Sequence, residues 1–302
     1  MNMQFVTGTD DRLFLYALIL LQSFANAGAA DAIKVCDFGL TAGQRSFLKS
    51  HNKLLVAETP LPSNCQHPIY KKAALVDYIP YDIDAVMWLD ADVMLTGKTP
   101  LLEVAALIHE MNNSGAMIAA CADQNNLDLG SFFSFFQTLG HNTAPFVELL
   151  DRLGVALDHR YLNSGVFITT SREWLLEWKS VTLDTKEPFL VEQNIFNVLA
   201  WRTPERVRIL DNRRWNVHGS ILDQISIGAE LASLHCDGQE VMVLHATAPD
   251  KRHVEPLEGS GKLGDRRIPV HLRLFGNQRL RAQQFALLDA FIKLHVQQRD
   301  QF

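Results

Sequence analysis

The chain has 302 residues, of which 47% are hydrophobic and 21% are charged, and its formal net charge is −6. This length suits one large domain or two small ones around a buried core, and the composition excludes a disordered, fibrous or collagen-like protein. The negative net charge argues against general nucleic-acid binding, so we expect no nucleic-acid partner.

The N-terminal segment allows two interpretations. An apolar stretch over 13–21 is followed by "ANA" at 25–27, as in a secretory signal peptide. Against this, the preceding "FVTGTDDR" carries acids rather than a positive n-region, and the apolar run is too short to cross a bilayer as a helix. We therefore favour a first strand over 4–7, a turn, and a buried helix from about residue 13.

Apolar, strand-like runs then alternate with helical patterns. Several runs are hydrophobic at consecutive positions, as in strands that are covered on both faces. Thr41 and Ser171 are predicted N-caps of two helices. The predicted strands are 3–8, 32–39, 52–58, 85–90, 116–123, 165–170, 206–210 and 240–245, and the predicted helices are 12–27, 41–50, 68–78, 100–111, 145–153, 171–182 and 189–200. This alternation predicts an α/β fold with a mostly parallel sheet flanked by helices.

The composition changes near the C-terminus. No repeat or linker divides the earlier residues, so we expect one domain over 1–250 and a small basic extension over 251–302. The extension ends in a predicted amphipathic helix over 279–297. Its basic segment 266–281 has two interpretations: it packs over an acceptor cleft, or it contacts an anionic membrane surface.

Cysteine usage bears on the compartment. The four cysteines are scattered along the chain and show no metal-ligand spacing. Such thiols fit a reducing compartment. We therefore expect a cytoplasmic protein, with peripheral contact to the inner face of a membrane if the basic segment binds lipid.

Asp90 and Asp92 stand one residue apart in the apolar run "VMWLDADVML". Buried carboxylates are costly unless a cation or hydrogen-bond donors compensate them. Both acids follow a predicted strand, and ligands of open α/β sheets bind beyond the carboxyl ends of the strands. Side chains two apart on an extended segment share a face, so both acids could reach one Mg²⁺ or Mn²⁺ ion. The alternative is an ordinary turn or N-cap aspartate.

Three further polar features accompany the acid pair. His245 ends an apolar strand, so we expect it at the same edge of the sheet, as a third metal ligand. In "YLNSGVFI", Asn163 and Ser164 precede a glycine that allows close backbone approach to a ligand. Glu192 and Gln193 open the helical pattern "VEQNIFN". Each feature alone also fits a plain structural role, such as a turn or an exposed first helical turn.

The ordered set of these motifs resembles the retaining, GT-A-fold glycosyltransferases of family 8, which include glycogenin and bacterial lipopolysaccharide galactosyl- and glucosyltransferases. The resemblance covers residues 4–252. It rests on the segments "FVTGTDDRLFLYALILLQSF", "YKKAALVDYIPYDIDAVMWLDADVML", "YLNSGVFI", "VEQNIFN" and "VLHATAPDKR". It implies a GT-A (Rossmann-like) fold with a mixed sheet. It also implies a metal-dependent retaining enzyme that moves a hexose from a UDP-sugar to a glycan, lipid-linked or protein acceptor.

The resemblance also implies which residues bind the nucleotide and the metal. Asp90, Asp92 and His245 would coordinate Mn²⁺, or Mg²⁺, on the diphosphate. The nucleotide-binding residues would be Gly8, Thr9, Asp10 and Asp11 beside the uridine, and Lys72 and Lys251 near the phosphates. Lys72 stands where the family usually has an arginine, which loses bidentate geometry.

For the sugars, the resemblance implies contacts from Asp123 and Asn163, with Ser164 in the same motif. Gln193 would lie beside the anomeric carbon, and Glu192 would bind donor-sugar hydroxyls. Because position 193 is an amide rather than a carboxylate nucleophile, we expect front-face attack with the departing phosphate oxygen as base. Retention itself is implied by the resemblance alone.

Two other functions stay open at this stage. One is a non-catalytic nucleotide-sugar-binding or scaffold protein of the same fold. The other is a metal-dependent nucleotide phosphohydrolase or nucleotidyltransferase that uses the same acid pair. The products distinguish them, because cleavage by the latter would leave UMP rather than UDP.

Overall fold

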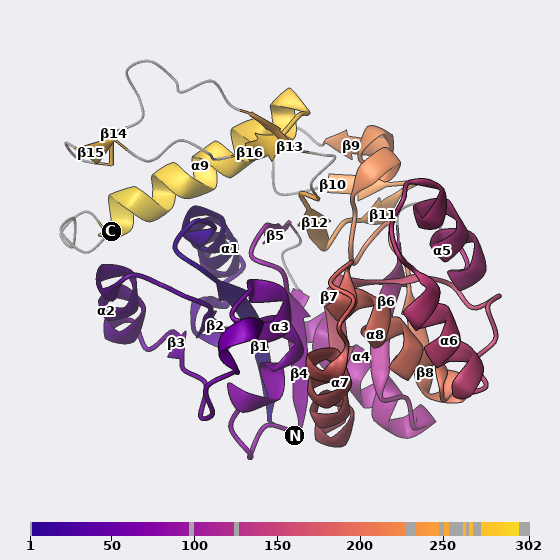
Figure 1. Ribbon diagram of the computed structural model, residues 1–302. Coiled ribbons are helices and arrows are strands. Elements are labelled where there is room, and N and C mark those ends of the chain that lie inside the picture. The colour runs from indigo at the N-terminus through magenta and orange to yellow at the C-terminus, as the bar shows by residue number, and fades with distance from the viewer. Residues whose placement is uncertain are drawn as a thin grey trace.

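The chain forms a central sheet between two layers of helices (Figure 1). The computed structural model describes residues 2–96, 100–123, 127–227, 234–247, 251–253, 262–263, 266–267 and 273–295. The strands of the central sheet are β1 (Met3–Thr9), β2 (Ile33–Asp37), β3 (Leu54–Leu55), β4 (Ala85–Leu89), β6 (Ile118–Ala122), β7 (Leu162–Thr169) and β8 (Val207–Leu210). The helices are α1 (Phe14–Asn26), α2 (Ala42–Ser50), α3 (Pro68–Ala73), α4 (Pro100–Ser114), α5 (Leu129–Thr138), α6 (Ala144–Arg152), α7 (Arg172–Asp184), α8 (Val191–Trp201) and α9 (Gln278–His295).

The strand order of the central sheet is β3-β2-β1-β4-β7-β6-β8. Neighbouring strands are parallel except at β7, which runs antiparallel to both β4 and β6. The predicted α/β fold with a mixed, mostly parallel sheet is therefore confirmed. Smaller sheets pair β5 (Val93–Leu95) with β12 (Val243–His245), β9 (Ile225–Ile227) with β10 (Leu234–Cys236) and β11 (Gln239–Glu240), β13 (Lys251–His253) with β16 (Arg273–Phe275), and β14 (Lys262–Leu263) with β15 (Arg266–Arg267).

Two hydrophobic clusters cover the two faces of the sheet. In β1, Phe5 belongs to one cluster and Val6 to the other, and Met87 and Trp88 of β4 divide in the same way. Successive side chains of a strand point to opposite faces, so both are buried when helices cover both sides. Helices α1, α2, α4 and α9 contribute to the first cluster, and α3 and α5 to α8 contribute to the second. This double burial explains the consecutive apolar residues of the strands.

Local sequence signals place several helix ends. Thr41 starts α2 with a capping box and Ser171 caps α7, as predicted. The predicted helix over 68–78 is instead α3 followed by a 3-10 turn at Leu75–Asp77. Helix α5 was not predicted, because its Gly, Ser and Phe residues are weak helix formers. Asp128 compensates by capping its first turn.

The predicted strand over 240–245 does not join the central sheet. Its last residues form β12, which pairs antiparallel with β5, the short strand that follows the acid pair. The register sets His245 opposite Val93, and the N–H of Ala246 donates to the carbonyl of Asp92 at 3.0 Å. His245 therefore ends a strand and reaches the acid pair as expected, although this strand is outside the central sheet. The histidine is brought to the acid pair by β5 instead.

Helix α9 lies along α1 at the top of Figure 1. Leu280, Leu288 and Phe291 are buried in the same hydrophobic cluster as α1, and Phe285 and Ile292 pack against it. The predicted apolar stripe of the C-terminal helix is confirmed over these residues. The domain boundary at residue 250 stays a prediction, because 248–250 and most of the residues between 251 and 272 lie outside the described part of the chain.

The basic segment 266–281 is described only in part. Within it, the apolar side chains of Leu274, Phe275 and Leu280 are at most 1% exposed and belong to the hydrophobic core. Side chains that dip into a membrane would have to be exposed, so the structure gives the membrane interpretation no support. Among the described residues, no helix is both long enough and apolar enough to span a bilayer.

Candidate functional site

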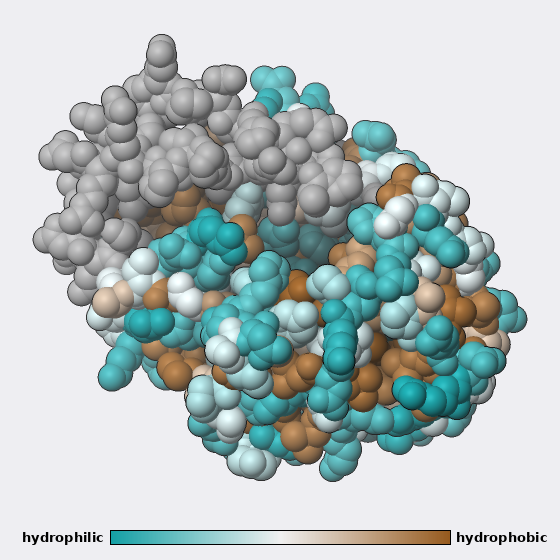
Figure 2. Space-filling model, viewed as in Figure 1, coloured by the Kyte–Doolittle hydropathy of each residue, from teal (hydrophilic) through white to brown (hydrophobic). Residues whose placement is uncertain are grey.

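Polar side chains gather where β4, β7 and β6 meet at one edge of the sheet. Strands β4 and β6 end at this edge, and the antiparallel β7 begins there. Asp90 and Asp123 directly follow β4 and β6, and Asn163 and Ser164 lie at the start of β7. The space-filling view shows hydrophilic residues in a hollow of this face, near the position of β5 and β12 in Figure 1 (Figure 2). Because β7 lies between β4 and β6, it brings these residues together although they are far apart in the chain.

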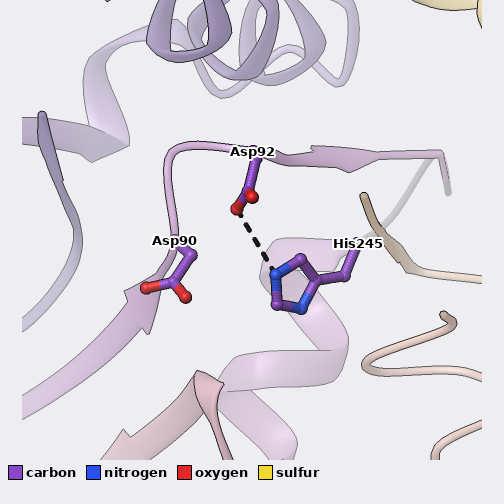
Figure 3. A group of neighbouring side chains, drawn as sticks. All are labelled: Asp90, Asp92 and His245. Atoms are coloured by element: carbon purple, nitrogen blue, oxygen red, sulfur yellow. Dashed lines mark ion pairs between the residues drawn. The ribbon is translucent and has the colours of Figure 1, made fainter. Parts of the chain in front are cut away.

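Asp90, Asp92 and His245 form what we call the metal cluster (Figure 3). One ligand atom from each of the three lies within 4.8 Å of the others, and Nε2 of His245 is 3.3 Å from Oδ1 of Asp92. Carboxylate oxygens with one imidazole nitrogen are a donor set that suits Mn²⁺ or Mg²⁺. The predicted convergence of these three residues is therefore observed, and the residues fit a divalent cation.

The imidazole of His245 lies directly against Gly165 of β7. A Cβ atom at Gly165 would come under 3.0 Å from the His245 ring. Only glycine leaves this space. The sequence suggested that this glycine lets a ligand approach the backbone, but in the structure it makes room for the histidine.

Lys72, Asp90, Glu192 and Ser164 form a second group, which we call the lysine cluster. Nζ of Lys72 lies 3.0 Å from Oδ1 of Asp90 and 3.1 Å from Oε1 of Glu192, and it donates to Oγ of Ser164 at 3.1 Å. The Lys72 side chain is only 8% exposed. The predicted residues are thus brought together, with the three N–H groups of Lys72 directed to side chains of the protein itself.

Burial and charge act against each other in the lysine cluster. Burial would lower the pKa of Lys72, but the charges of Asp90 and Glu192 outweigh it, so the pKa of Lys72 is raised and the ammonium stays charged. Burial raises the pKa of Glu192, and the charge of Lys72 opposes that shift. The cluster therefore contains its own cation.

Gln193 is held at both ends of its amide. Its Oε1 accepts hydrogen bonds from the backbone N–H and the hydroxyl of Ser164, both at 3.1 Å. Its Nε2 donates to the Tyr161 hydroxyl at 3.3 Å and to Oδ2 of Asp123 at 3.4 Å. Tyr161 is fully buried and in turn donates to Asn194 at 2.7 Å. The sequence did not single out Tyr161, because nothing in its local pattern distinguishes it from a core residue.

Asn163 connects Asp123 to the metal cluster. Its Nδ2 donates to Oδ2 of Asp123 at 3.1 Å, and its Oδ1 accepts from the Gly165 N–H at 2.8 Å and from Nδ2 of Asn216 at 3.0 Å. Oδ1 of Asn216 then lies 2.9 Å from Nδ1 of His245. Asn216 was not predicted, since it follows β8 in a segment without periodicity or motif.

Two aromatic rings lie between the end of β1 and the metal cluster. Phe38 lies against Gly8, where a Cβ atom would come under 3.0 Å from its ring. Phe38 stacks on Trp88 with ring centroids 6.0 Å apart, and Nε1 of Trp88 donates to Oδ1 of Asp90 at 2.7 Å. Trp88 therefore helps to fix the direction of the Asp90 carboxylate, a role that its apolar surroundings in the sequence concealed.

The other predicted nucleotide residues differ in their surroundings. Thr9 is buried and Asp11 is exposed. The carboxylate of Asp10 accepts from the Leu13 N–H at 3.0 Å and pairs with Arg12 at 2.7 Å, so it faces the turn before α1. Lys251 lies in β13, and its side chain is outside the part of the chain that the structure describes.

Solved structures of other proteins resemble this fold, although no similar sequence was found. No family model matches the sequence, and no curated protein sequence matches it. The galactosyltransferase LgtC, solved with donor and acceptor sugar analogues, is 17% identical with a TM-score of 0.57, over 95% of each chain. The glycosyltransferase GlyE of Streptococcus pneumoniae, in its apo form, is 12% identical with a TM-score of 0.54, over 98% of this chain and 64% of its own. The chain spans 40% of the bifunctional glycosyltransferase WbbM. Over nearly its whole length, the protein therefore has the GT-A fold of LgtC and GlyE.

Proposed function

We propose that this protein is a metal-dependent retaining glycosyltransferase, similar to family 8, that moves a hexose from a UDP-sugar to a glycan, lipid-linked or protein acceptor. The observation that carries the proposal is the metal cluster, at the carboxyl edge of a GT-A sheet, sharing Asp90 with the lysine cluster. The metal cluster suits a cation that binds a diphosphate. The lysine cluster places the carboxylate of Glu192 next to the metal cluster.

The metal cluster would serve the leaving group. Mn²⁺ or Mg²⁺ held by Asp90, Asp92 and His245 would stabilise the negative charge that develops on a departing diphosphate. Lys72 and Trp88 both donate to the same oxygen of Asp90. These two donors hold the Asp90 carboxylate in one orientation before the substrate binds, so the site is preorganised.

The neighbouring polar residues would order the sugars. Asp123 and Glu192 offer carboxylates that accept hydrogen bonds from sugar hydroxyls. Because Gln193 is an amide whose oxygen already accepts from Ser164, it supplies no carboxylate nucleophile. We therefore infer front-face attack: the anomeric C–O bond to phosphate breaks, the acceptor oxygen bonds to the same face, and its proton passes to a phosphate oxygen of the leaving group.

A donor screen tests this proposal. The purified chain is incubated with common UDP-sugars, a panel of glycan acceptors and Mn²⁺, and released nucleotides are separated. We expect UDP release that needs Mn²⁺ and stops in excess chelator. The variant Asp92→Ala should stay folded and release no UDP, whereas Asp184→Ala, an exposed acid at the end of α7, should match the wild type.

Other outcomes would overturn the proposal. Full activity of Asp92→Ala, or full activity in chelator, would contradict the role of the metal cluster. Release of UMP would indicate a phosphohydrolase or nucleotidyltransferase. Donor binding that raises thermal stability, with no nucleotide released for any donor and acceptor, would indicate a non-catalytic sugar-nucleotide-binding protein.

A further inference from the structure

Two buried asparagines link a carboxylate of the sugar side to the histidine of the metal cluster. Asn216 is 0% exposed and Asn163 is 7% exposed. Asn163 donates to Asp123 at 3.1 Å, Asn216 donates to Asn163 at 3.0 Å, and Oδ1 of Asn216 lies 2.9 Å from Nδ1 of His245. Buried amides satisfy both their donors and their acceptors. The donor and the acceptor of each hydrogen bond in this series can therefore be assigned.

The assignment starts from two groups, one of which can only accept a hydrogen bond and one of which can only donate. The carboxylate of Asp123 accepts, so Asn163 must present its NH₂ group to it. The backbone N–H of Gly165 donates, so Asn163 must present its oxygen there. The same Asn163 oxygen faces Asn216, which must therefore donate with Nδ2. The remaining Asn216 atom, Oδ1, is then the one that faces Nδ1 of His245.

The amide order determines the tautomer of the histidine. Since Oδ1 of Asn216 accepts, Nδ1 of His245 carries the hydrogen, and in the neutral ring Nε2 carries the lone pair. Nε2 is the nitrogen that faces Asp92, at 3.3 Å. A lone pair and a carboxylate oxygen that face each other at this distance attract a cation between them.

We propose that Asn216 is a positioning residue, which holds His245 in the tautomer whose Nε2 binds the divalent cation. The inference rests on the metal site of the proposed function. Asn216 also joins this site, through Asn163, to Asp123 on the sugar side. The backbone of β7 anchors the arrangement, because Gly165 both donates to Asn163 and makes room for the His245 ring.

Two substitutions separate the acceptor role from simple packing. Asn216→Leu keeps the branched shape of the side chain and removes the acceptor, and Asn216→Asp keeps an acceptor oxygen for His245 but loses the donor to Asn163. Loss of an outer partner of a metal-bound histidine typically weakens metal binding about 10- to 100-fold. We therefore expect Asn216→Leu to weaken Mn²⁺ binding by that factor, and Asn216→Asp to bind close to wild-type strength. Free Mn²⁺ is measured by electron paramagnetic resonance, without nucleotide.

Nitrogen NMR of the imidazoles supplies a readout that packing alone would not change. In the metal-free wild type, we expect neutral His245, assigned with His245→Gln, to carry its hydrogen on Nδ1. Asn216→Leu should show a mixture of tautomers. Asn197→Leu is the matched control: Asn197 is also 0% exposed, and it bonds to the backbone of Leu162 and Gln193. This control should lose stability but keep the His245 tautomer and the Mn²⁺ affinity.

Each outcome decides the inference. Wild-type His245 with its hydrogen on Nε2 would overturn it, whether or not Asn216→Leu folds. Unchanged Mn²⁺ affinity in Asn216→Leu would also overturn it. A wild type that binds no Mn²⁺ but has the Nδ1–H tautomer would instead contradict the proposed function, so the two failures are distinguishable.

Discussion

The lysine cluster and the metal cluster share Asp90 but balance charge in different ways. In the lysine cluster, the chain supplies the cation itself, with Lys72 at 3.0 Å from Asp90 and 3.1 Å from Glu192. The metal cluster consists of two carboxylates and an imidazole, groups that bind a cation taken from solution. In the lysine cluster the fold itself supplies the compensating charge, whereas under the proposed function a bound cation would supply it in the metal cluster.

The largest expected effect on folding is in the lysine cluster. Lys72→Met leaves the buried Glu192 and the partly exposed Asp90 without their cation, so the free energy of unfolding of the metal-free protein should fall by about 3–5 kcal/mol. Urea denaturation measures this. Lys293→Met is the control, since its ion pair with Asp289 is exposed and worth about 0.5 kcal/mol or less. Equal stability of the two variants would remove the contrast between the clusters.

The metal cluster should respond in the opposite way. Asp92→Asn should change the free energy of unfolding without metal by no more than about 0.5 kcal/mol, because the amide keeps the shape of the carboxylate and the Asp92 side chain is partly exposed. At about 100 times the wild-type Kd, Mn²⁺ should stabilise the wild type by about 2.7 kcal/mol and leave the variant unchanged. A variant stabilised by Mn²⁺ to the same extent would place the cation elsewhere.

A smaller effect is expected where the backbone supports the metal cluster. Gly165→Ala puts a methyl group under 3.0 Å from the His245 ring, so the ring must move. We expect a loss of about 1–3 kcal/mol in stability and about 10-fold weaker Mn²⁺ binding by calorimetry. Gly130→Ala, whose Cβ would make an ordinary 3.4 Å contact with Leu157, should keep the Mn²⁺ affinity. Unchanged affinity in Gly165→Ala would show that the ring position is not decisive.

The smallest effect on Mn²⁺ binding should come from Tyr161→Phe, on the sugar side of the site. It removes a hydroxyl that donates to Asn194 at 2.7 Å and accepts from Gln193, so stability should fall by about 1–2 kcal/mol. Sugar transfer should slow because the Gln193 amide is less firmly held. Mn²⁺ affinity should stay at the wild-type value. A fall in that affinity would mean that the two sides of the site are not separable in this way.

The sequence predicts the architecture well because burial on both sheet faces leaves long apolar runs, and because hydroxyl caps such as Thr41 and Ser171 mark helix starts. Helix α5 was missed, since packing of its phenylalanines in the core overrides their weak helix propensity. Local signals are therefore reliable where a pattern repeats, and weaker where tertiary contacts decide.

In the candidate site too, residues with a local sequence signal were predicted, and residues that depend on tertiary contacts were missed. Asp90 and Asp92 are visible as charges within an apolar run, and His245 as a polar strand end. The route by which His245 arrives was missed, because β5 and β12 are only three residues each. Asn216 was missed because its importance lies wholly in contacts with residues distant in the chain.

The most direct test of the metal cluster is a crystal structure with Mn²⁺ and UDP, with the ion located by anomalous scattering. The account predicts one ion bound by Asp90, Asp92 and Nε2 of His245, with the UDP phosphates completing its coordination. An ion bound elsewhere, an ion bound by Nδ1 of His245, or no ion at saturating Mn²⁺ would contradict it.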